Sequence, residues 1–527
     1  MRILFQNIAT ELDEGPQAAV ALAEEKLRAA KDGFLAAGIF KTSVDARRGA
    51  VRFVSSVWAD LTEEGFARLQ KDRKLSYTIL REEPLEIVFG TQPLDGRPVV
   101  IGLGPGGLFA ALLLARNGYR PIVLERGGDV EERAQRVAQF WKGEKLYTNC
   151  NVQFGEGGAG TFSDGKLTTR IHDPLCRFVL EEFVRHGAPE DILVRAKPHV
   201  GTDHLRRVVH SVREEIVSLG GEVHFHTCAD GFRAQNGRIR GILAAGTKFS
   251  TGAVIVAIGH SARDTFESLS ACGALLAPKP FSVGVRIEHL QSEIDRALYG
   301  KDAGHPNLPK GEYQLSHRRA DGRAAYTFCM CPGGQVVAAA SEEGGVVTNG
   351  MSFYARDGKN ANSALAVSVG PDDFGSDWRG GVAFQRKIER AAFAAGGGSY
   401  AAPACTVGAL LGVRSGGKIV EPTYPLGVTE CDLTRVLPSF VVETLAQSLP
   451  VLGKKLHGFD APDAFLTAAE TRTSSPVRVL RGQDCCAVGI EGLYPCGEGA
   501  GYAGGIMSAA VDGMRCSIAL MRRFARP

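Results

Sequence analysis

One stretch decides the fold of this chain: Arg97-Pro-Val-Val-Ile-Gly-Leu-Gly-Pro-Gly-Gly-Leu-Phe-Ala-Ala-Leu-Leu-Leu-Ala-Arg116, followed after Asn117 by Gly-Tyr-Arg-Pro-Ile-Val-Leu-Glu125. Its apolar runs and glycines predict a strand, a glycine turn, a helix and a second strand. The second strand ends in the carboxylate of Glu125. This order is typical of a βαβ unit that binds a dinucleotide.

The glycines of this turn meet different steric demands. Gly102 permits the tight turn, Gly104 lets the backbone approach a pyrophosphate, and Gly107 lets the helix pack closely on the strand. The helix begins near Gly106, so its free N–H groups and positive dipole end face the phosphates. Glu125 is placed to accept hydrogen bonds from a ribose. The expected cofactor contacts are Gly102, Gly104, Pro105, Gly106, Gly107, Glu125 and Arg126.

The run from Pro98 to Ala115 carries no charge, so a membrane-spanning helix is the alternative interpretation. Four glycines and two prolines interrupt the run, and arginines flank it. These features argue against a span. The sequence therefore predicts a dinucleotide site and no membrane segment.

A second glycine turn lies near the C-terminus, in Glu491-Gly-Leu-Tyr-Pro-Cys-Gly-Glu-Gly-Ala-Gly-Tyr-Ala-Gly-Gly-Ile-Met-Ser-Ala-Ala-Val-Asp-Gly513. It resembles the second signature of FAD-dependent oxidoreductases, in which a short strand ends in Gly-Asp or Gly-Glu and a glycine turn opens a last helix. The resemblance implies a ribityl contact at Glu498 and a helix N-terminus that faces the flavin. An NAD domain needs no such half-site, so FAD is favoured over NAD. The contacts expected here are Gly497, Glu498, Gly504, Gly505 and Ile506.

A third segment, Gly252-Ala-Val-Ile-Val-Ala-Ile-Gly-His-Ser-Ala262, is similar to the Ala-Thr-Gly element of the same superfamily and adds Gly259 to the expected contacts. Before it, the apolar spacing predicts a helix over 205–219, a strand over 222–227 and a hairpin at Asn236-Gly237. In related flavoproteins the backbone after the equivalent strand meets the adenine. The resemblance therefore implies a contact at Ala229.

The composition indicates an ordinary soluble protein. A chain of 527 residues can bury a large core and form two or three domains. Hydrophobic residues make up 44% and charged residues 23%, and a net charge of +3 is too small to indicate nucleic-acid binding. Acidic residues from Glu11 onward leave no long apolar region of a secretory signal, so a cytoplasmic location is expected.

Twelve cysteines without a Cys-x-x-Cys pair predict neither a disulfide scaffold nor a zinc site, and no metal is expected. Cys329 and Cys331 stand two apart, so on a regular strand both would face one pocket. We favour their interpretation as buried small hydrophobes, the usual state of free cysteine. A redox-active pair is the alternative.

The first 90 residues form a separate unit. Strand patterns at 1–8, 39–45 and 51–60 and helical patterns at 17–37 and 61–69 predict a small ferredoxin-like α/β module, whose expected role is packing or docking. The expected domains are 1–90 for this module, 91–265 for the first part of a FAD-binding domain, 266–480 for an inserted substrate domain and 481–527 for the segment that closes the FAD-binding domain.

The segment Phe154-Gly-Glu-Gly-Gly-Ala-Gly-Thr-Phe-Ser-Asp-Gly-Lys-Leu167 alternates glycine with polar residues. Such a backbone bends closely around a ligand and offers hydroxyl donors, which favours a binding loop over a mobile surface loop. Lys166 could stabilise negative charge on a reduced flavin, or lie in solvent. The cofactor contacts expected here are Gly158, Gly160, Thr161 and Ser163.

Residues 266–480 contain no second strand, glycine turn and helix with a terminal acid, so no dedicated NAD(P)H domain is expected. NAD(P)H would then bind weakly, as a transient electron donor. Arginine could clamp an anionic substrate bidentately. The candidates are Arg286, Arg356, Arg414, Arg472 and Arg478, with Arg472 the best placed to face the flavin.

The chain resembles, nearly end to end, a bacterial family of uncharacterised FAD-dependent dehydrogenases. The resemblance implies the fold and the cofactor and supplies no substrate. Besides the loop at 154–167, its marks are Lys41-Thr-Ser-Val-Asp-Ala-Arg47, Pro280-Phe-Ser-Val-Gly-Val-Arg286, Thr327-Phe-Cys-Met-Cys-Pro-Gly-Gly334, Asn349-Gly-Met-Ser and Glu470-Thr-Arg-Thr-Ser-Ser-Pro-Val-Arg478.

The predicted fold is α/β: a Rossmann-like FAD-binding domain of the glutathione-reductase type, an inserted α+β substrate domain and the small N-terminal module. The predicted function is that of an FAD-dependent oxidoreductase that transfers hydride to or from a small organic molecule. The candidate catalytic residues are Arg472, Lys166, Cys329 and Cys331. A flavin-dependent monooxygenase, or a flavoprotein that docks on RNA or a protein through its N-terminal module, remains an alternative.

Overall fold

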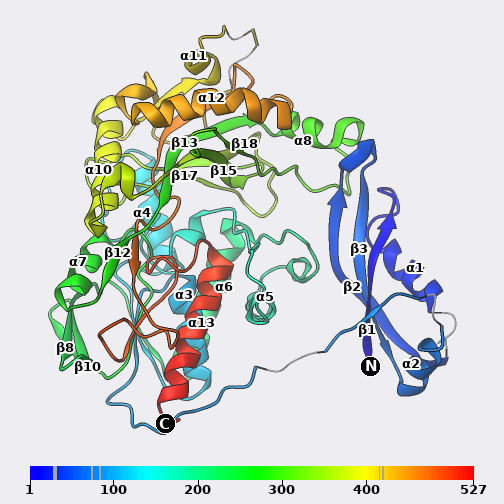
Figure 1. The fold of residues 1–527 in the computed structure, drawn as a ribbon, viewed down its shortest axis with the longest axis horizontal. Helices are drawn as coiled ribbons and strands as arrows, with labels where there is room; N and C mark the ends of the chain where they lie inside the picture. The colour runs from blue at the N-terminus through cyan, green and yellow to red at the C-terminus, as the bar shows by residue number, and fades with distance from the viewer. Residues whose placement is uncertain (28–31, 73–74, 82–84, 415, 418–419) are drawn as a thin grey trace.

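The computed structural model describes residues 1–27, 32–72, 75–81, 85–414, 416–417 and 420–527. A five-stranded parallel sheet, a seven-stranded mixed sheet and a four-stranded N-terminal sheet organise it. Figure 1 shows the seven-stranded sheet above the parallel-sheet half, with the N-terminal sheet standing to one side. The α/β fold class predicted from the sequence is confirmed.

The parallel sheet has the strand order β23-β11-β5-β6-β7. Its central strands are buried on both faces, as expected for a parallel sheet covered by other layers. All five carboxyl ends lie at one edge, because every neighbouring pair is parallel. The strands are β5 (Val99–Ile101), β6 (Ile122–Leu124), β7 (Glu222–His224), β11 (Val254–Val256) and β23 (Leu493–Pro495).

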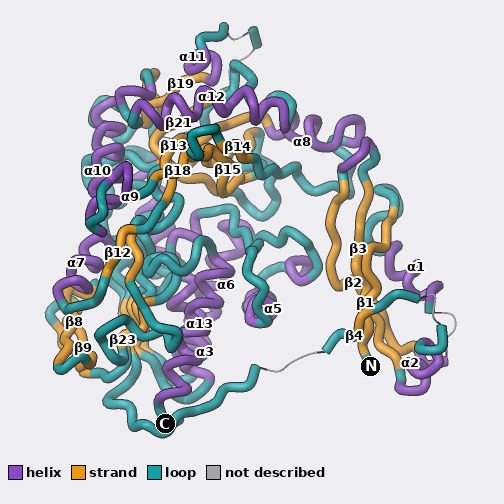
Figure 2. The backbone as a smooth tube through the Cα atoms, viewed as in Figure 1, coloured by secondary structure: helices purple, strands orange, loops and turns teal. Residues whose placement is uncertain are grey.

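Helix α3 (Pro105–Arg116) returns the chain from β5 to β6, as the sequence predicted. Its residues from 106 to 115 are all buried, because α13 (Ile506–Arg523) and α6 (Gly201–Ser218) pack against it. A Cβ added to Gly513 would lie 2.0 Å from the Gly106 carbonyl oxygen, so α3 and α13 approach with almost no space between their backbones. Figure 2 shows these three helices together below the seven-stranded sheet.

The remaining elements of this half surround the parallel sheet. Asn236 (φ 52°) and Gly237 (φ 71°) form the tight turn of the predicted hairpin. The strands are β8 (Ala229–Gln235), β9 (Arg238–Ala244) and β10 (Thr247–Ser250), and the helices are α4 (Val130–Trp141), α5 (Leu175–Arg185) and α7 (Arg263–Ala271).

The seven-stranded sheet has the order β14-β15-β18-β13-β21-β19-β20. Helices α10 and α12 lie along its upper side in Figure 1, so its central strands are buried on both faces. The strands are β13 (Phe281–Leu290), β14 (Ser316–Arg318), β15 (Ala324–Cys331), β18 (Asn360–Val369), β19 (Ala402–Thr406), β20 (Val428–Glu430) and β21 (Phe465–Glu470). The helices of this half are α8 (Gln291–Tyr299), α9 (Pro371–Phe374), α10 (Trp378–Ala395), α11 (Val407–Leu411) and α12 (Ser439–Lys455).

Two short antiparallel pairs complete the half. The chain enters and leaves it through β12 (Leu276–Pro278) and β22 (Val477–Val479), which pair with each other. The second pair is β16 (Gln335–Ala338) with β17 (Thr348–Met351).

The N-terminal sheet is antiparallel with the order β2-β3-β1-β4, the ferredoxin-like arrangement that the sequence predicted. The predicted helix over 17–37 is too long: α1 ends at Lys26 and β2 begins at Phe34, while residues 28–31 lie outside the described part. β2 begins where Phe34 pairs with Leu61 of β3, and just before it Gly33 packs so closely that an added Cβ would lie 2.4 Å from the Gly65 Cα. The elements are β1 (Arg2–Thr10), α1 (Ala18–Lys26), β2 (Phe34–Asp45), β3 (Arg52–Leu61), α2 (Glu63–Leu69) and β4 (Thr78–Ile79).

The module is attached to the rest of the chain at two places. The edge strand β2 pairs through Thr42, whose N–H donates to the Val194 carbonyl (2.7 Å) and whose carbonyl accepts from Ala196 (2.8 Å). Asn307 donates to the Leu12 carbonyl at 2.8 Å. None of the helices built by the described residues is both long and apolar enough to cross a bilayer.

Candidate cofactor and substrate site

A cavity of about 470 Å³ lies at the carboxyl edge of the parallel sheet, where open α/β sheets bind ligands. We call one side the glycine wall (residues 102–106, 155–160 and 497–506) and the other the sheet wall (residues 327–330, with Asn349, Glu470 and Arg472). The predicted cofactor residues that line the cavity are Gly102, Gly104, Pro105, Gly106, Glu125, Arg126, Gly158, Gly160, Ser163, Ala229, Gly259, Gly497, Glu498, Gly504, Gly505 and Ile506.

Gly104 caps α3 and faces open space. A Cβ added there would meet only the Gly158 Cα, at an ordinary 3.7 Å, so the protein itself does not demand glycine at this position. At Gly107 an added Cβ would lie 1.9 Å from the Gly102 carbonyl oxygen, so that glycine serves packing and lies outside the cavity lining. Thr161, the other predicted contact outside the lining, is buried behind the turn.

The Glu125 carboxylate braces three turns of the glycine wall. It accepts hydrogen bonds from the backbone N–H groups of Leu103 (2.8 Å), Gly127 (2.9 Å) and Gly155 (3.0 Å). Glu125 also lines the cavity. The contact of its carboxylate with a ribose stays a prediction. Arg126 pairs with Asp264 at 2.7 Å.

The loop before the predicted binding segment is held by the fully buried Arg133 of α4. Its guanidinium donates to the carbonyls of Asn151 (2.8 Å), Val152 (2.8 Å) and Glu156 (2.7 Å). Backbone carbonyls at a buried site need such donors, because unpaired polar groups cost free energy when burial removes their water. Arg133 thereby fixes the course of the chain into Gly158 and Gly160.

The C-terminal glycine turn is fixed from α13. Asp512 accepts the Gly497 N–H at 2.7 Å and pairs with Arg481 at 2.6 Å. Gly505 (φ 152°) caps α13, and an added Cβ at Gly504 or Gly505 would meet no atom within 4 Å. Two helix N-termini, of α3 and α13, therefore open on the same cavity and favour an anionic ligand such as a pyrophosphate.

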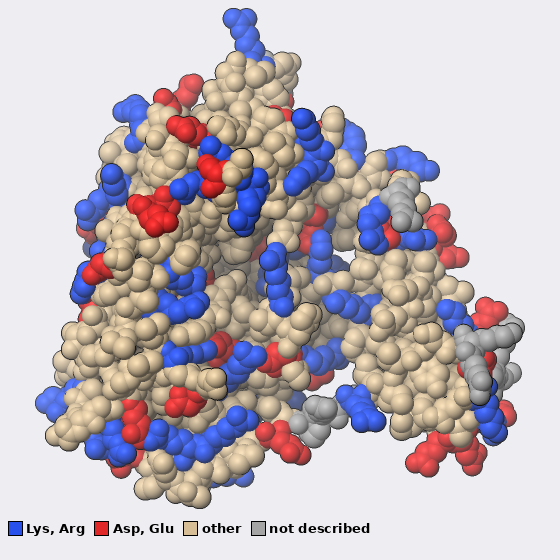
Figure 3. All heavy atoms as spheres, in the orientation of Figure 1, with Lys and Arg blue, Asp and Glu red and all other residues tan. Residues whose placement is uncertain are grey.

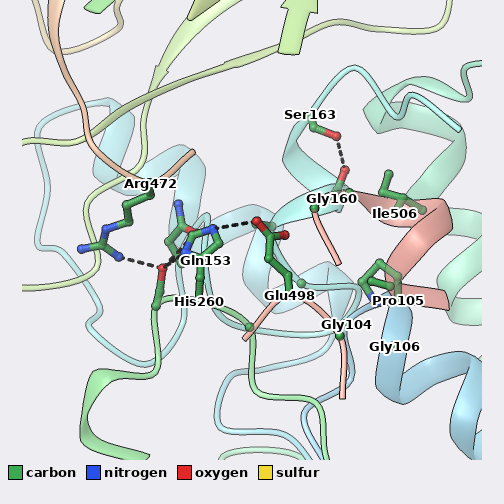
Figure 4. Close-up of a pocket in the computed structure, with 18 of the residues that line it drawn as sticks. Gly104, Pro105, Gly106, Gln153, Gly160, Ser163, His260, Arg472, Glu498 and Ile506 are labelled. Carbon is green, nitrogen blue, oxygen red and sulfur yellow. Dashed lines mark hydrogen bonds and ion pairs between the residues drawn. The ribbon is translucent and has the colours of Figure 1, made fainter. Parts of the chain in front are cut away.

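Glu498 and His260 face each other across the cavity in Figure 4, 4.0 Å apart between Oε1 and Nε2. Burial raises the pKa of Glu498 to about 7. Burial, together with the nearby Arg472 and Arg263, lowers the pKa of His260 to about 3, so the imidazole is neutral at physiological pH. The His260 Nδ1 lies 3.0 Å from the Ser261 hydroxyl, which donates to the Gln153 amide oxygen at 3.2 Å.

Arg472 lies at the end of this chain of hydrogen bonds, and its guanidinium contacts side chains of the protein. It donates to Ser261 (2.9 Å) and Ser341 (2.5 Å) and pairs with Glu389 (3.1 Å). Glu389 also pairs with the buried Arg263 at 2.9 Å. The two guanidinium groups hold the pKa of Glu389 below its usual range against the opposing effect of burial. Arg472 thus lines the cavity as part of a buried ion network.

The sheet wall is built on a β-bulge. The register of β15 against β18 shifts between Phe328 and Cys331, and the extra residues face the cavity. Beneath the bulge Arg286 pairs with Glu470 at 2.9 Å and donates to the Cys329 carbonyl at 2.9 Å. Arg286 is fully buried, as expected for a charge with a bidentate partner.

Two lysines share one carboxylate at a further part of the cavity. Lys166 and Lys197 pair with Glu312 at 3.2 Å and 2.9 Å. Burial would raise the pKa of Glu312, but these lysines and Arg356 lower it to about 2. Lys and Arg side chains border the hollow on the face drawn in Figure 3. The sequence predicted Lys166 and gave no indication of Lys197 or Glu312.

The other predicted arginines have different surroundings. Arg286 and Arg356 are buried with Glu470 and Asp164, Arg478 donates to the Gly501 carbonyl, and Arg414 is exposed. His260 was within a quoted motif, and its position directly after Gly259 was the signal that could have identified it. Gln153, Lys197 and Glu312 have no local signal, because distant elements bring them to the cavity.

Part of the chain matches a known protein family. Residues 280–473 match the family described as "FAD-dependent protein, C-terminal domain-like". An uncharacterized protein of Clostridium beijerinckii is 45% identical over the whole length of both chains. A protein of Hypoxylon pulicicidum described as an FAD-dependent monooxygenase is 26% identical over 39% of this chain and 45% of its own. The chain belongs to the same family as the Clostridium protein, and its residues 280–473 carry the C-terminal domain of FAD-dependent proteins.

Solved structures with related folds are distant. CtdE in complex with FAD is 14% identical, covers 81% of this chain and 84% of its own, and superposes with a TM-score of 0.32. Glycine oxidase from Bacillus cereus is 10% identical, covers 82% of this chain and 98% of its own, and has a TM-score of 0.33.

FAD is the cofactor, and the cavity fits it. The glycine wall offers two helix N-termini. It also leaves open space in front of Gly104, which protein atoms do not fill. Glu125 is available for the ribose, Glu498 for the ribityl chain and Ala229 for the adenine; these three contacts stay predictions. The polar and apolar side chains of the sheet wall line the rest of the cavity.

Proposed function

We propose that the protein transfers hydride between FAD and a small organic anion bound against the sheet wall. FAD accepts or supplies the hydride when bound, and the protein orients the substrate and sets the local charge. The lysine pair at Glu312 carries the proposal. Two ammonium groups beside one carboxylate give a local excess of positive charge at this part of the cavity, which suits a carboxylate or phosphate on the substrate.

The apolar part of the substrate has a surface to contact. Phe328 is 38% exposed although it lines the cavity, so its ring offers apolar area that no protein group covers. Burying such area against a ligand stabilises the complex by roughly 25 cal/mol per Å². The substrate class is therefore an organic anion with an apolar body.

The N-terminal module has a part in placing Lys197. Thr42 of β2 forms backbone hydrogen bonds with Val194 and Ala196, directly before Lys197 in the chain. The module thereby fixes the segment that carries one of the two ammonium groups. This supports a structural role for the module in the substrate site.

NAD(P)H binds transiently, if it supplies electrons. Of the larger sheets that the described residues form, one is fully parallel, and its glycine turns are the ones that we assign to FAD. A second dinucleotide then has no helix N-terminus with a glycine turn for its phosphates. Hydride from NAD(P)H would reach the flavin through the open cavity.

Binding of benzoate, an anion with an apolar body, tests the lysine pair without knowledge of the natural substrate. We expect benzoate to perturb the flavin absorbance of the FAD-loaded protein with saturation. Glu312→Gln should bind it several-fold more tightly, because both ammonium groups are released. The double variant Lys166→Gln, Lys197→Gln should weaken benzoate binding by about tenfold, equivalent to about 1.4 kcal/mol.

Lys387→Gln, a surface lysine outside the cavity lining, is the matched control and should leave benzoate binding unchanged. Equal benzoate affinity in all four proteins would overturn the lysine assignment. Anaerobic screening of organic acids, NADH and NADPH for bleaching of the flavin band then identifies the substrate. Oxygen consumption coupled to hydroxylated product would favour a monooxygenase, the activity by which the Hypoxylon relative is described.

A further inference from the structure

The bulge in β15 presents one cysteine to the cofactor cavity and hides another behind it. Cys329 is partly exposed and lines the cavity, whereas Cys331 is fully buried. A regular strand would have turned both thiols to the same side. Bulges commonly re-aim a side chain beside an active site.

The backbone at Cys329 is held in an uncommon conformation. Its φ is +45°, in the left-handed region that side-chain-bearing residues rarely adopt. Such a residue persists only where its surroundings enforce the conformation, and these positions gather at functional sites. Here Arg286 enforces it, because its guanidinium donates to the Cys329 carbonyl while Glu470 holds the other edge.

The two thiols are in hydrogen-bond contact. The Cys331 thiol lies 3.3 Å from the Cys329 carbonyl oxygen, to which its single S–H donates, and it can turn instead to the neighbouring Cys329 sulfur. The interaction with the Cys331 thiol, followed by the charges of Arg286 and Lys166, lowers the pKa of Cys329 to about 6 against the opposing effect of burial. Donation to Cys329 and burial raise the pKa of Cys331. Cys329 is therefore the thiol that loses its proton first, and Cys331 is the one that keeps it.

A second thiol group in the molecule shows the opposite behaviour. Cys485 and Cys516 contact each other near Cys496, and the pKa of Cys516 is raised well above its usual value. Cys516 has no exposed surface. Cys485, like Cys329, is partly exposed and has a positive φ (61°), but it lies outside the cavity lining and its pKa is raised. The contrast separates Cys329 from ordinary buried cysteine.

We propose that Cys329 and Cys331 form a dithiol–disulfide couple that exchanges electrons with the flavin. Cys329 is the thiol presented to the cavity, and Cys331 is the buried resolving thiol. The inference rests on the proposed function, because FAD must occupy the cavity. It extends the substrate class to thiols and disulfides that reach the Cys329 sulfur.

The chemistry balances without another reagent. When the Cys329 thiolate and the Cys331 thiol reduce the flavin, one S–H bond breaks, one S–S bond forms, and the flavin takes both electrons and the one proton. In the other direction the reduced flavin opens the disulfide. A substrate disulfide is attacked by the Cys329 thiolate, one substrate thiolate leaves, and Cys331 displaces the second while losing its proton.

The test counts electrons in the FAD-loaded protein. After treatment with diamide, which oxidises neighbouring thiols, the wild type should need two more electrons per flavin for full anaerobic reduction than Cys329→Ser or Cys331→Ala. Mass spectrometry should find a disulfide that joins residues 329 and 331. Cys272→Ser, a partly exposed thiol away from the cavity, is the matched control and should titrate as the wild type.

A second measurement asks whether electrons pass between the couple and the flavin. Light with EDTA reduces bound flavin directly, so the oxidised wild type should release two thiols before the yellow band bleaches. Immediate bleaching without thiol release would overturn the proposal, as would equal electron counts in all four proteins. FAD content is measured in each protein. Its loss in the wild type would instead contradict the proposed function.

Discussion

The two walls of the cavity are built by opposite means. The glycine wall is made of backbone: turns whose glycines leave space at Gly104 and Gly504, with N–H groups at two helix ends. The sheet wall is made of side chains whose charges are buried in pairs, such as Arg286 with Glu470 and Arg472 with Glu389. The first wall suits the phosphates of a dinucleotide, and the second can vary with the substrate.

This difference has an energetic consequence. Removing a glycine from the first wall changes the space left for the ligand, whereas removing one ion from the second leaves its partner as an uncompensated buried charge. Substitutions in the glycine wall should therefore weaken cofactor binding, and substitutions of the buried ions of the sheet wall should destabilise the fold. The predictions below test that division, beginning with the largest effect.

Glu389→Ala should destabilise the fold by about 3–5 kcal/mol, because it leaves Arg263 and Arg472 buried without their shared carboxylate. Urea unfolding, followed by circular dichroism, measures the change. Glu267→Ala removes the partner of the half-exposed Arg379 and should change stability little. Similar unfolding curves for the two variants would show that the sheet wall does not depend on its ion pairs.

Gly104→Val should lower FAD affinity by roughly 100-fold or more, about 2.8 kcal/mol, while the protein stays folded. The new side chain enters the space for the pyrophosphate and meets protein only at 3.7 Å. Fluorescence titration with FAD measures it. Gly107→Ala should instead impair folding, because its Cβ would lie 1.9 Å from a carbonyl oxygen. A yellow, FAD-saturated Gly104→Val protein would remove the fingerprint assignment.

Arg472→Ala separates two roles for this residue. If Arg472 supports the wall, the variant loses about 1–3 kcal/mol of stability, because Ser261 and Ser341 lose their donor, and FAD stays bound. If Arg472 clamps the substrate, as the sequence predicted, substrate-dependent flavin reduction falls while stability is retained. We expect the first result, and Arg472→Lys should restore part of the stability.

Stability should depend on pH through Glu498. Its pKa in the folded protein is about 7, above the ordinary 4.5, so the protonated carboxyl favours the folded state. That stability is complete below about pH 4.5 and is lost as the pH rises through about 7. Glu498→Gln should remove this pH dependence from the thermal unfolding midpoint, and the surface variant Glu421→Gln should keep it. A parallel profile for wild type and Glu498→Gln would contradict the raised pKa.

The sequence predicted local structure best where a residue type has one physical reason to be present. The hairpin at Asn236-Gly237 needs two positive φ angles, and the turn before α3 needs Gly102 with a φ of 92°. The predicted helix over 17–37 was too long, because the chain from Phe34 pairs as a strand with β3, whose Leu61 is distant in sequence. Periodicity cannot show such a contact.

The cysteine pair shows the same limit at the site. Its spacing predicted two thiols on one side of a strand, and the bulge against β18 placed them in different surroundings. The position of the bulge depends on Arg286, which lies 43 residues from Cys329 and reaches its carbonyl only in the folded sheet. The choice between packing and redox roles therefore required the structure.

By itself, the sequence determined the dinucleotide fold and the glycine wall, because turns, caps and helix N-termini follow from residues within a few positions of one another. The tertiary structure alone decided the sheet wall. Glu312 meets Lys166 across 146 residues of chain, and Arg472 meets Ser261 across 211. A buried or shared charge has a defined protonation state and position only when its partners are packed around it. These partners are distant in sequence and meet only in the folded chain.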